Sequence, residues 1–163
     1  MRIRLAATGF GAVMMAGVLM GCGPQKPGET DVLNVSAKLP AGLPAPVMDW
    51  RVVTSGVDRA HGTMSTLTAN DAAIFYTGVG KYPAGSALAL TTWAQREDPH
   101  WFGARIPDGF ASVELVTFAK GADGQTTATY RQFVGDPVHE VTGAADAEAR
   151  KAAILGMRNA EMP

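Results

Sequence analysis

Hydrophobic and polar residues alternate along parts of the chain between residues 61 and 134, which is the pattern of β-strands with one buried face. The alternation is clearest over residues 61–68 and 126–134, where threonine recurs, and residues 110–118 have strand character through valine, leucine and phenylalanine. Residues 87–93 are mostly apolar and predict a buried strand. The Gly-Ala-Asp-Gly sequence of residues 121–124 predicts a tight hairpin between the last two strands.

Two further segments carry helical signals. Residues 72–77 follow a capping asparagine and stop at a glycine-rich turn, so they predict a short helix. Residues 144–157 combine alanine, leucine and charged residues and predict a C-terminal helix. Residues 47–53 predict a helix or a strand ending at a Ser-Gly pair, and residues 95–108 predict a polar, aromatic loop. Together these elements predict an α+β fold, an antiparallel sheet with a short helix and a C-terminal helix packed against it.

The N-terminal segment has the layout of an exported precursor. Arg2 and Arg4 precede an uncharged run over residues 5–20, and Gly21 precedes the only cysteine of the chain, Cys22. This arrangement resembles the bacterial lipobox, at which a signal peptidase cuts and the cysteine thiol receives a diacylglyceryl group. Two alternatives remain open: an uncleaved membrane anchor, and an ordinary secretory signal followed by an unrelated cysteine.

These features divide the chain into three parts. Residues 1–21 form the predicted lipoprotein signal peptide, residues 22–46 a proline- and glycine-rich extended tether, and residues 47–163 the folded domain. Lipid on Cys22 would anchor the domain to a membrane of the cell envelope, facing the periplasm or the outside. Gly23 stands where inner-membrane lipoproteins of enteric bacteria carry a retaining aspartate, so the outer membrane is favoured.

Charge and cysteine content narrow the function classes. The chain has 14 lysine and arginine residues against 15 aspartate and glutamate residues, and loss of the two signal-peptide arginines leaves a formal charge of −3. Basic residues do not cluster, so we expect no nucleic-acid partner. With one cysteine the chain forms no internal disulfide, even in an oxidising compartment.

Three short motifs follow one another along the domain. They are Asn-Asp-Ala-Ala at residues 70–73, Lys-Tyr-Pro-Ala-Gly-Ser at 81–86 and Leu-Thr-Thr-Trp at 90–93. In this order they resemble the cytochrome P-460 domain family over roughly residues 49–134, and residues 96–107 look like a signature of a lipoprotein branch of that family. The resemblance implies an antiparallel β fold with a haem pocket on one sheet face. Haem-bearing members of the family oxidise hydroxylamine or bind nitric oxide, and they attach the haem through a C-terminal Cys-x-x-Cys-His motif.

The chain departs from the family at this attachment motif. Two thioether bonds need two thiols, whereas the only thiol is that of Cys22 and no cysteine follows Phe133. We therefore expect no covalent haem and a small-ligand binding or accessory module, since nothing in the sequence demands an enzyme. Two alternatives stay open: a redox protein that binds haem noncovalently through His139 or His100 and retains nitrogen-oxide chemistry, and a structural envelope protein. The histidines form no close pair, so we expect no metal site, and His61 is predicted to be a solvated turn residue.

The predicted loop over residues 95–108 concentrates aromatic and polar side chains, as the wall of a ligand pocket does. The candidate pocket residues are Trp93, His100, Trp101 and Arg105. Arg105 would receive a carboxylate or another anion through two parallel hydrogen bonds. In the alternative arrangement, Trp101 and Phe102 plug the end of the sheet while Arg105 pairs with Glu97 or Asp98.

Overall fold

The structure is a computed structural model, and it describes residues 34–143 and 146–159. The predicted signal peptide, the lipidation residue Cys22 and the first part of the tether lie outside the described residues. Within the described part of the chain, no helix has the length and apolar composition needed to cross a membrane.

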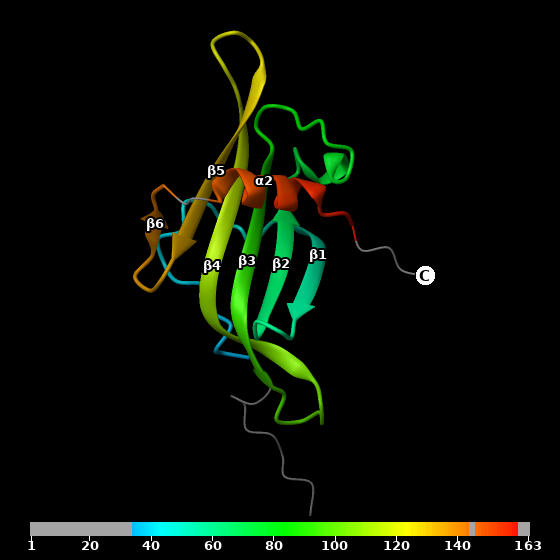
Figure 1. The fold of residues 1–163 in the computed structure, drawn as a ribbon, viewed down its shortest axis with the longest axis vertical. Coiled ribbons are helices and arrows are strands. Elements are labelled where there is room, and N and C mark those ends of the chain that lie inside the picture. The colour runs from blue at the N-terminus through cyan, green and yellow to red at the C-terminus, as the bar shows by residue number, and fades with distance from the viewer. Residues whose placement is uncertain (1–33, 144–145, 160–163) are drawn as a thin grey trace, which may run out of the picture. The chain divides into compact units, whose positions relative to one another are not determined.

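Within the described residues, six strands form one antiparallel sheet in which each strand pairs with its neighbour in sequence, so the spatial order equals the chain order (Figure 1). The strands are β1 (Arg51–Asp58), β2 (Thr63–Ala69), β3 (Ala87–Glu97), β4 (Arg105–Lys120), β5 (Thr126–Val134) and β6 (His139–Val141). A single-turn 3-10 helix, η1 (Ile74–Tyr76), lies between β2 and β3, and the helix α2 (Ala147–Gly156) follows β6. The fold is therefore α+β, as the sequence predicts, with most of its residues in the antiparallel sheet.

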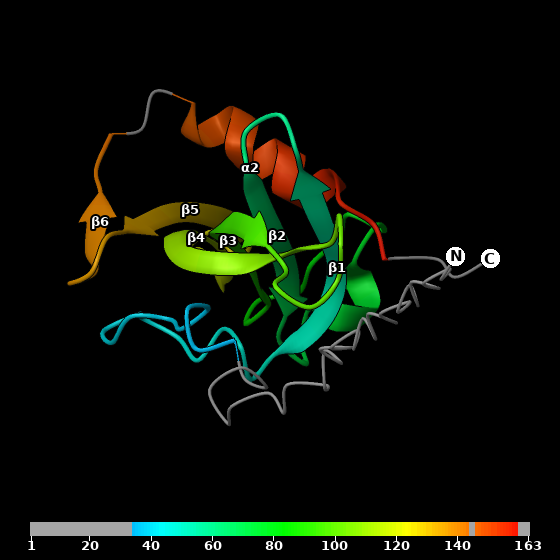
Figure 2. The same ribbon diagram turned by 90° about the horizontal axis from the view of Figure 1, so that it is seen from below.

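Both faces of the central strands are covered, which explains why β3 begins as an almost unbroken apolar run. Figure 2 shows α2 on one side of the sheet and the coil formed by residues 34–50 on the other. Leu88 and Leu90 of β3 belong to the core under the helix, together with the fully buried Ile154 of α2. Ala89, between them, belongs to the core on the opposite face, where Leu39 and other apolar residues of the coil pack.

Most predicted strands are confirmed, and β5 has the predicted bounds. The predicted hairpin turn is also present, since the Gly124 N–H donates to the Gly121 carbonyl over 3.0 Å. The segment predicted as helix or strand over residues 47–53 is strand from Arg51, where β1 begins, and β1 continues beyond the Ser-Gly pair to Asp58. The short strand β6 at the sheet edge has no counterpart in the prediction.

Three predictions about local structure are corrected. Half of the segment predicted as a loop over residues 95–108 is strand, because Gln95, Arg96 and Glu97 pair with residues 105–107 and extend the β3–β4 hairpin. Only residues 98–104 form the loop. The predicted helix at residues 72–77 is one 3-10 turn, and α2 begins at Ala147 rather than at residue 144.

The described part of the predicted tether packs on the sheet. Leu39, Leu43 and Ala45 contact the core of the second face, and Val47 is fully buried in it. The Thr68 hydroxyl of β2 donates a 2.8 Å hydrogen bond to the Val47 carbonyl, which fixes the coil to the sheet. The packed structure thus extends N-terminally past the predicted boundary at residue 47.

A buried carboxylate fixes α2 to the other face. Glu114 of β4 is 2% exposed, and its two carboxylate oxygens accept hydrogen bonds from Nε and Nη2 of Arg150 in α2. The Tyr130 hydroxyl of β5 donates to the same carboxylate over 2.6 Å. Burial, and next the hydrogen bond to Glu114, raise the pKa of Tyr130, so the hydroxyl keeps its proton and remains a donor.

Candidate functional site

The aromatic residues of the β3–β4 loop do not plug the sheet. Trp101 is 72% exposed and the Phe102 side chain is fully exposed, so the predicted packing of these two rings is wrong. The other half of that alternative is confirmed, because Arg105 lies 3.4 Å from the Glu97 carboxylate. Arg105 is therefore already paired across the hairpin.

The four candidate pocket residues lie at two different levels of the hairpin. Trp93 is 4% exposed and sits within the sheet, in register with Met64 of β2 and Phe110 of β4. His100 and Trp101 lie in the loop, beyond the last pairs of the ladder. The structure thus joins His100, Trp101 and Arg105 at one hairpin end and places Trp93 in the interior.

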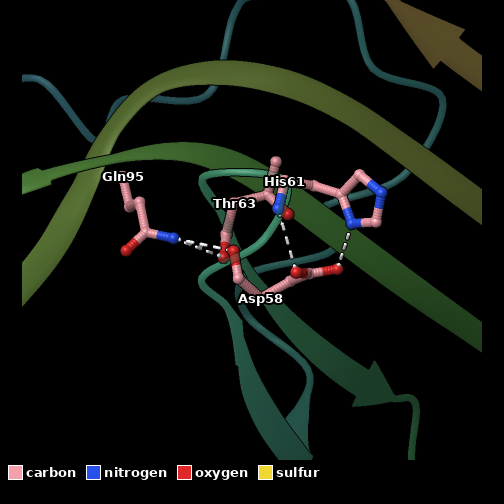
Figure 3. Close-up of polar contacts among 4 residues, drawn as sticks. All are labelled: Asp58, His61, Thr63 and Gln95. Atoms are coloured by element: carbon pink, nitrogen blue, oxygen red, sulfur yellow. Dashed lines mark hydrogen bonds and ion pairs between the residues drawn. The ribbon is translucent and has the colours of Figure 1, made fainter.

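The histidines lie on separate parts of the surface. His139 opens β6 at one edge of the sheet and is exposed, as is His100 in its loop. His61 lies in the turn between β1 and β2, as predicted, and its ring Nδ1 is 2.7 Å from the Asp58 carboxylate (Figure 3). No group of three potential metal ligands occurs among residues 34–143 and 146–159.

The Asp58–His61 pair stabilises the β1–β2 turn. The other carboxylate oxygen of Asp58 accepts the backbone N–H of His61 over 3.0 Å, and Gln95 of β3 donates to the Asp58 carbonyl over 2.8 Å. The hydrogen bond with the His61 ring lowers the pKa of the Asp58 carboxyl. Both side chains are mostly exposed, at 80% for His61 and 52% for Asp58, so we assign the pair the role of stabilising the turn.

A hollow of about 250 Å³ lies on the helix-covered side of the sheet, where the chain leaves α2. Leu67 and Leu90, which are both buried, belong to its lining, together with Met157. Hydroxyl-bearing and small residues complete the lining, which are Thr54, Ser55, Gly56 and Ser65. Gly56 pairs with Ser65 across β1 and β2, and the absence of a side chain at Gly56 leaves this part of the hollow open.

Arg158 borders this hollow and a second one of about 210 Å³. The second hollow is lined by Arg158, Asn159 and residues 77–79. The Thr77 hydroxyl donates to the side-chain oxygen of Asn159 over 2.6 Å, which ties the end of the described chain to this loop. A Cβ at Gly78 would lie 3.5 Å from Cγ of Arg158, so the arginine side chain lies directly against the glycine.

The guanidinium of Arg158 forms no ion pair with any residue that the structure describes. An arginine of this kind, beside hydroxyl groups and buried leucines, has the chemistry to hold a small molecule with an anionic head and an apolar body. The sequence alone does not indicate this site, because Arg158 follows the last helix and belongs to no recognisable motif. Only the folding of the chain end back onto residues 77–79 brings it to the sheet.

A third hollow lies on the other sheet face. It measures about 380 Å³ and is formed within residues 39–49, so its walls come almost entirely from the coil. Leu39, Leu43 and Val47 supply apolar surface, and Asp49 is the one charged residue among the described residues that line it. These described residues offer no cationic group for an anion.

A scan against models of known protein families finds no match for this chain, and a search of curated proteins finds none either.

Proposed function

We propose that this protein is a bacterial envelope lipoprotein, anchored through Cys22 and favouring the outer membrane, whose P-460-like domain lacks covalent haem and binds a small amphiphilic carboxylate. The observation that carries the binding proposal is the hollow beside Arg158. The Arg158 guanidinium is free of ion pairs within the described residues, and Arg158 belongs to the lining of this hollow together with the buried residues Leu67 and Leu90.

The chemistry of the lining selects the ligand class. A guanidinium binds a carboxylate through two parallel hydrogen bonds, which is stronger and more directional than a bond between neutral groups. Hydroxyl groups on Ser55 and Ser65 supply further donors, while leucine and methionine side chains favour a short hydrocarbon body. The small volume favours a compact ligand over a large ring system.

The P-460-like part of the proposal draws support from the positions of the motif residues. The Asn70 side chain accepts the backbone N–H of Ala87 over 3.0 Å, which links the end of β2 to the start of β3. Tyr82 is buried and stacks on Phe118 with 4.7 Å between ring centres. Trp93 is buried in β3. Residues that two proteins share because they have the same fold are expected at structural positions of this kind.

Titration of the mature chain, residues 22–163, with hexanoate tests the binding proposal. We expect chemical-shift changes of backbone amides around residues 54–56 and 65–67. Arg158→Gln should weaken hexanoate binding about tenfold or more, because a charge-assisted bidentate contact contributes about 1.5–3 kcal/mol. Hexan-1-ol, which lacks the carboxylate, should bind equally to both forms.

Two variants separate the site from general effects. Gly56→Val should block both hexanoate and hexan-1-ol, since the new side chain enters the hollow and the backbone of Gly56 does not require positive φ. Arg59→Gln removes an exposed arginine from the β1–β2 turn and should change neither affinity. Equal loss of hexanoate binding in Arg59→Gln and Arg158→Gln would contradict the assignment.

The same sample tests the haem alternative and the anchor. Added haemin should give no Soret band that depends on His139 or His100. A Soret band that is lost in His139→Ala would instead support noncovalent haem binding as the function, in place of carboxylate binding.

The mass of the N-terminal peptide from the envelope fraction should show a diacylglyceryl group on Cys22, and a free thiol there would contradict the anchor.

A further inference from the structure

The β3–β4 hairpin extends past the ends of β1 and β2 and exposes two adjacent aromatic rings at its tip (Figure 1). Trp101 is 72% exposed and Phe102 has the full exposure of an isolated residue. Aromatic side chains of this size are rarely left in water side by side without a partner surface, because each offers a large apolar area for burial.

The loop holds this shape through its own hydrogen bonds. The Asp98 N–H donates to the Ala104 carbonyl over 3.1 Å, and the Ala104 N–H donates to the Trp101 carbonyl over 3.0 Å. The Asp98 carboxylate also accepts the His100 N–H over 2.8 Å. Gly103 takes a φ of 76°, which favours glycine, and completes the turn. The aromatic pair is thus presented outward by a closed loop and needs no packing behind it.

Charged residues form a belt behind the aromatic tip. Arg105 and Glu97 pair across the hairpin at 3.4 Å, and Arg96 lies 3.7 Å from Asp108 one step further back. Aromatic residues at the level of lipid headgroups, with paired charges on the water side, are the arrangement of an interfacial contact. Because the tip carries no excess of basic residues, attraction to anionic lipids is not expected to drive the contact.

The N-terminal chain meets the same hairpin. The Asn34 side-chain nitrogen donates to the Pro107 carbonyl over 2.6 Å, and the Arg96 guanidinium donates to the Asn34 side-chain oxygen over 3.3 Å. Trp101 at the tip lies five residues beyond Arg96, a stretch that spans at most about 17 Å at the rise of a strand. Cys22 precedes Asn34 by twelve residues, which span at most about 40 Å when extended. A lipid on Cys22 therefore has the reach to enter a bilayer that the tip touches.

We propose that Trp101 and Phe102 insert into the headgroup region of the bilayer that holds the Cys22 lipid, so that the domain contacts the membrane through the β3–β4 tip. This proposal rests on the lipid anchor of the proposed function. The partner of the aromatic pair is then a membrane surface composed of zwitterionic lipids.

The test uses the full mature chain with one introduced thiol for an environment-sensitive fluorophore. His100→Cys places the label beside the aromatic pair, and Ala122→Cys places it in the exposed β4–β5 turn at the other end of the sheet. The lipidated chain is reconstituted in phosphatidylcholine vesicles, and the same variants carrying Cys22→Ser serve as the soluble reference. Iodide quenching then reports how far each label is shielded.

We expect the quenching constant at position 100 to fall at least threefold on vesicles and the constant at position 122 to stay unchanged. Trp101→Ser with Phe102→Ser should remove the shielding at position 100. Equal quenching at both positions on vesicles would overturn the proposal. Shielding at position 100 in the soluble reference that increases with protein concentration would overturn it too, since the tip would then bind a second copy.

Failure of the anchor is distinguished by the mass of the N-terminal peptide. An unlipidated Cys22 contradicts the anchor and with it the premise of the tip contact. A lipidated Cys22 with an iodide-accessible position 100 contradicts the tip contact alone.

Discussion

Replacing Arg150 by methionine should lower the free energy of unfolding by about 3 kcal/mol. The change leaves the Glu114 carboxylate, which is 3% exposed as a side chain, with the Tyr130 hydroxyl as its remaining donor. Breaking a buried ion pair by removing one partner costs about 3–5 kcal/mol, because a charge stays buried without its counter-charge. We take the lower end, since the Arg150 side chain is 40% exposed and water already screens part of the attraction.

The sheet offers a matched control. Arg131 makes the same two-pronged contact with Glu140, and its side chain is also 40% exposed, but the Glu140 side chain is 37% exposed. Arg131→Met should therefore cost clearly less than Arg150→Met, because an exposed ion pair contributes little to stability. The two variants differ in the burial of the carboxylate and in a second contact of Arg131, whose guanidinium carbon lies 4.8 Å from the centre of the Phe133 ring. Loss of that ring contact can only raise the cost of Arg131→Met, so a larger cost for Arg150→Met is attributed to the burial of the Glu114 carboxylate.

Urea unfolding followed by circular dichroism measures both values. With an m-value of about 1.5–3 kcal/mol/M, a loss of 3 kcal/mol lowers the midpoint by about 1–2 M. The double variant Glu114→Leu with Arg150→Met should recover to within about 1.5 kcal/mol of the wild type, because no charge is then left buried. Equal costs for Arg150→Met and Arg131→Met, or a double variant no more stable than Arg150→Met, would refute the reasoning.

Two further predictions concern hydrogen bonds of single side chains. Asn70→Ala should lower the free energy of unfolding in urea by about 1–3 kcal/mol, because the Ala87 N–H loses its side-chain acceptor and the 2.9 Å hydrogen bond to the Gly85 carbonyl is removed. Asn70→Asp keeps the acceptor and should lower it less. A larger loss in Asn70→Asp than in Asn70→Ala would contradict this role of Asn70. His61→Ala should raise the Asp58 pKa toward its ordinary value in an NMR titration. Because the Asp58 pKa is lower in the folded than in the unfolded chain, the pair stabilises the fold at a pH above the unfolded-state pKa, and this stabilisation is lost as the pH falls through the folded-state pKa. An unchanged Asp58 pKa in His61→Ala would refute the contact.

Local signals in the sequence predict most of the sheet. The glycine-rich turn at residues 121–124 fixes the β4–β5 register, and β5 therefore has its predicted bounds. The extension of β3 through Gln95 and Glu97 is not predicted, because polar side chains on both faces of an exposed hairpin leave no hydrophobic pattern. The same residues pair well in space, since their backbone hydrogen bonds need no buried face.

Packing of the N-terminal coil is hidden for a different reason. Its prolines argue against helix and strand, but they do not prevent Leu39 and Leu43 from covering a sheet face.

Glu114, by contrast, can be recognised in the sequence as a residue that needs a partner. A single carboxylate between Val113 and Leu115 in a buried strand requires a partner, although the sequence does not say that the partner is Arg150, 36 residues later.

The candidate binding site depends on contacts that only the folded chain provides. Ile154 is fully buried against the sheet and the Glu114–Arg150 contact fixes the preceding turn of α2, so the helix ends at one defined place over β1 to β3. Met157 leaves the helix in an extended conformation, and this turns Arg158 against Gly78. The position of the Arg158 guanidinium is therefore set by the Glu114 carboxylate of β4, which fixes α2, and by Gly78 in the loop between β2 and β3. Binding chemistry built in this way leaves no local motif, which is why the sequence directs attention to the aromatic hairpin while the structure adds a site at the end of the last helix.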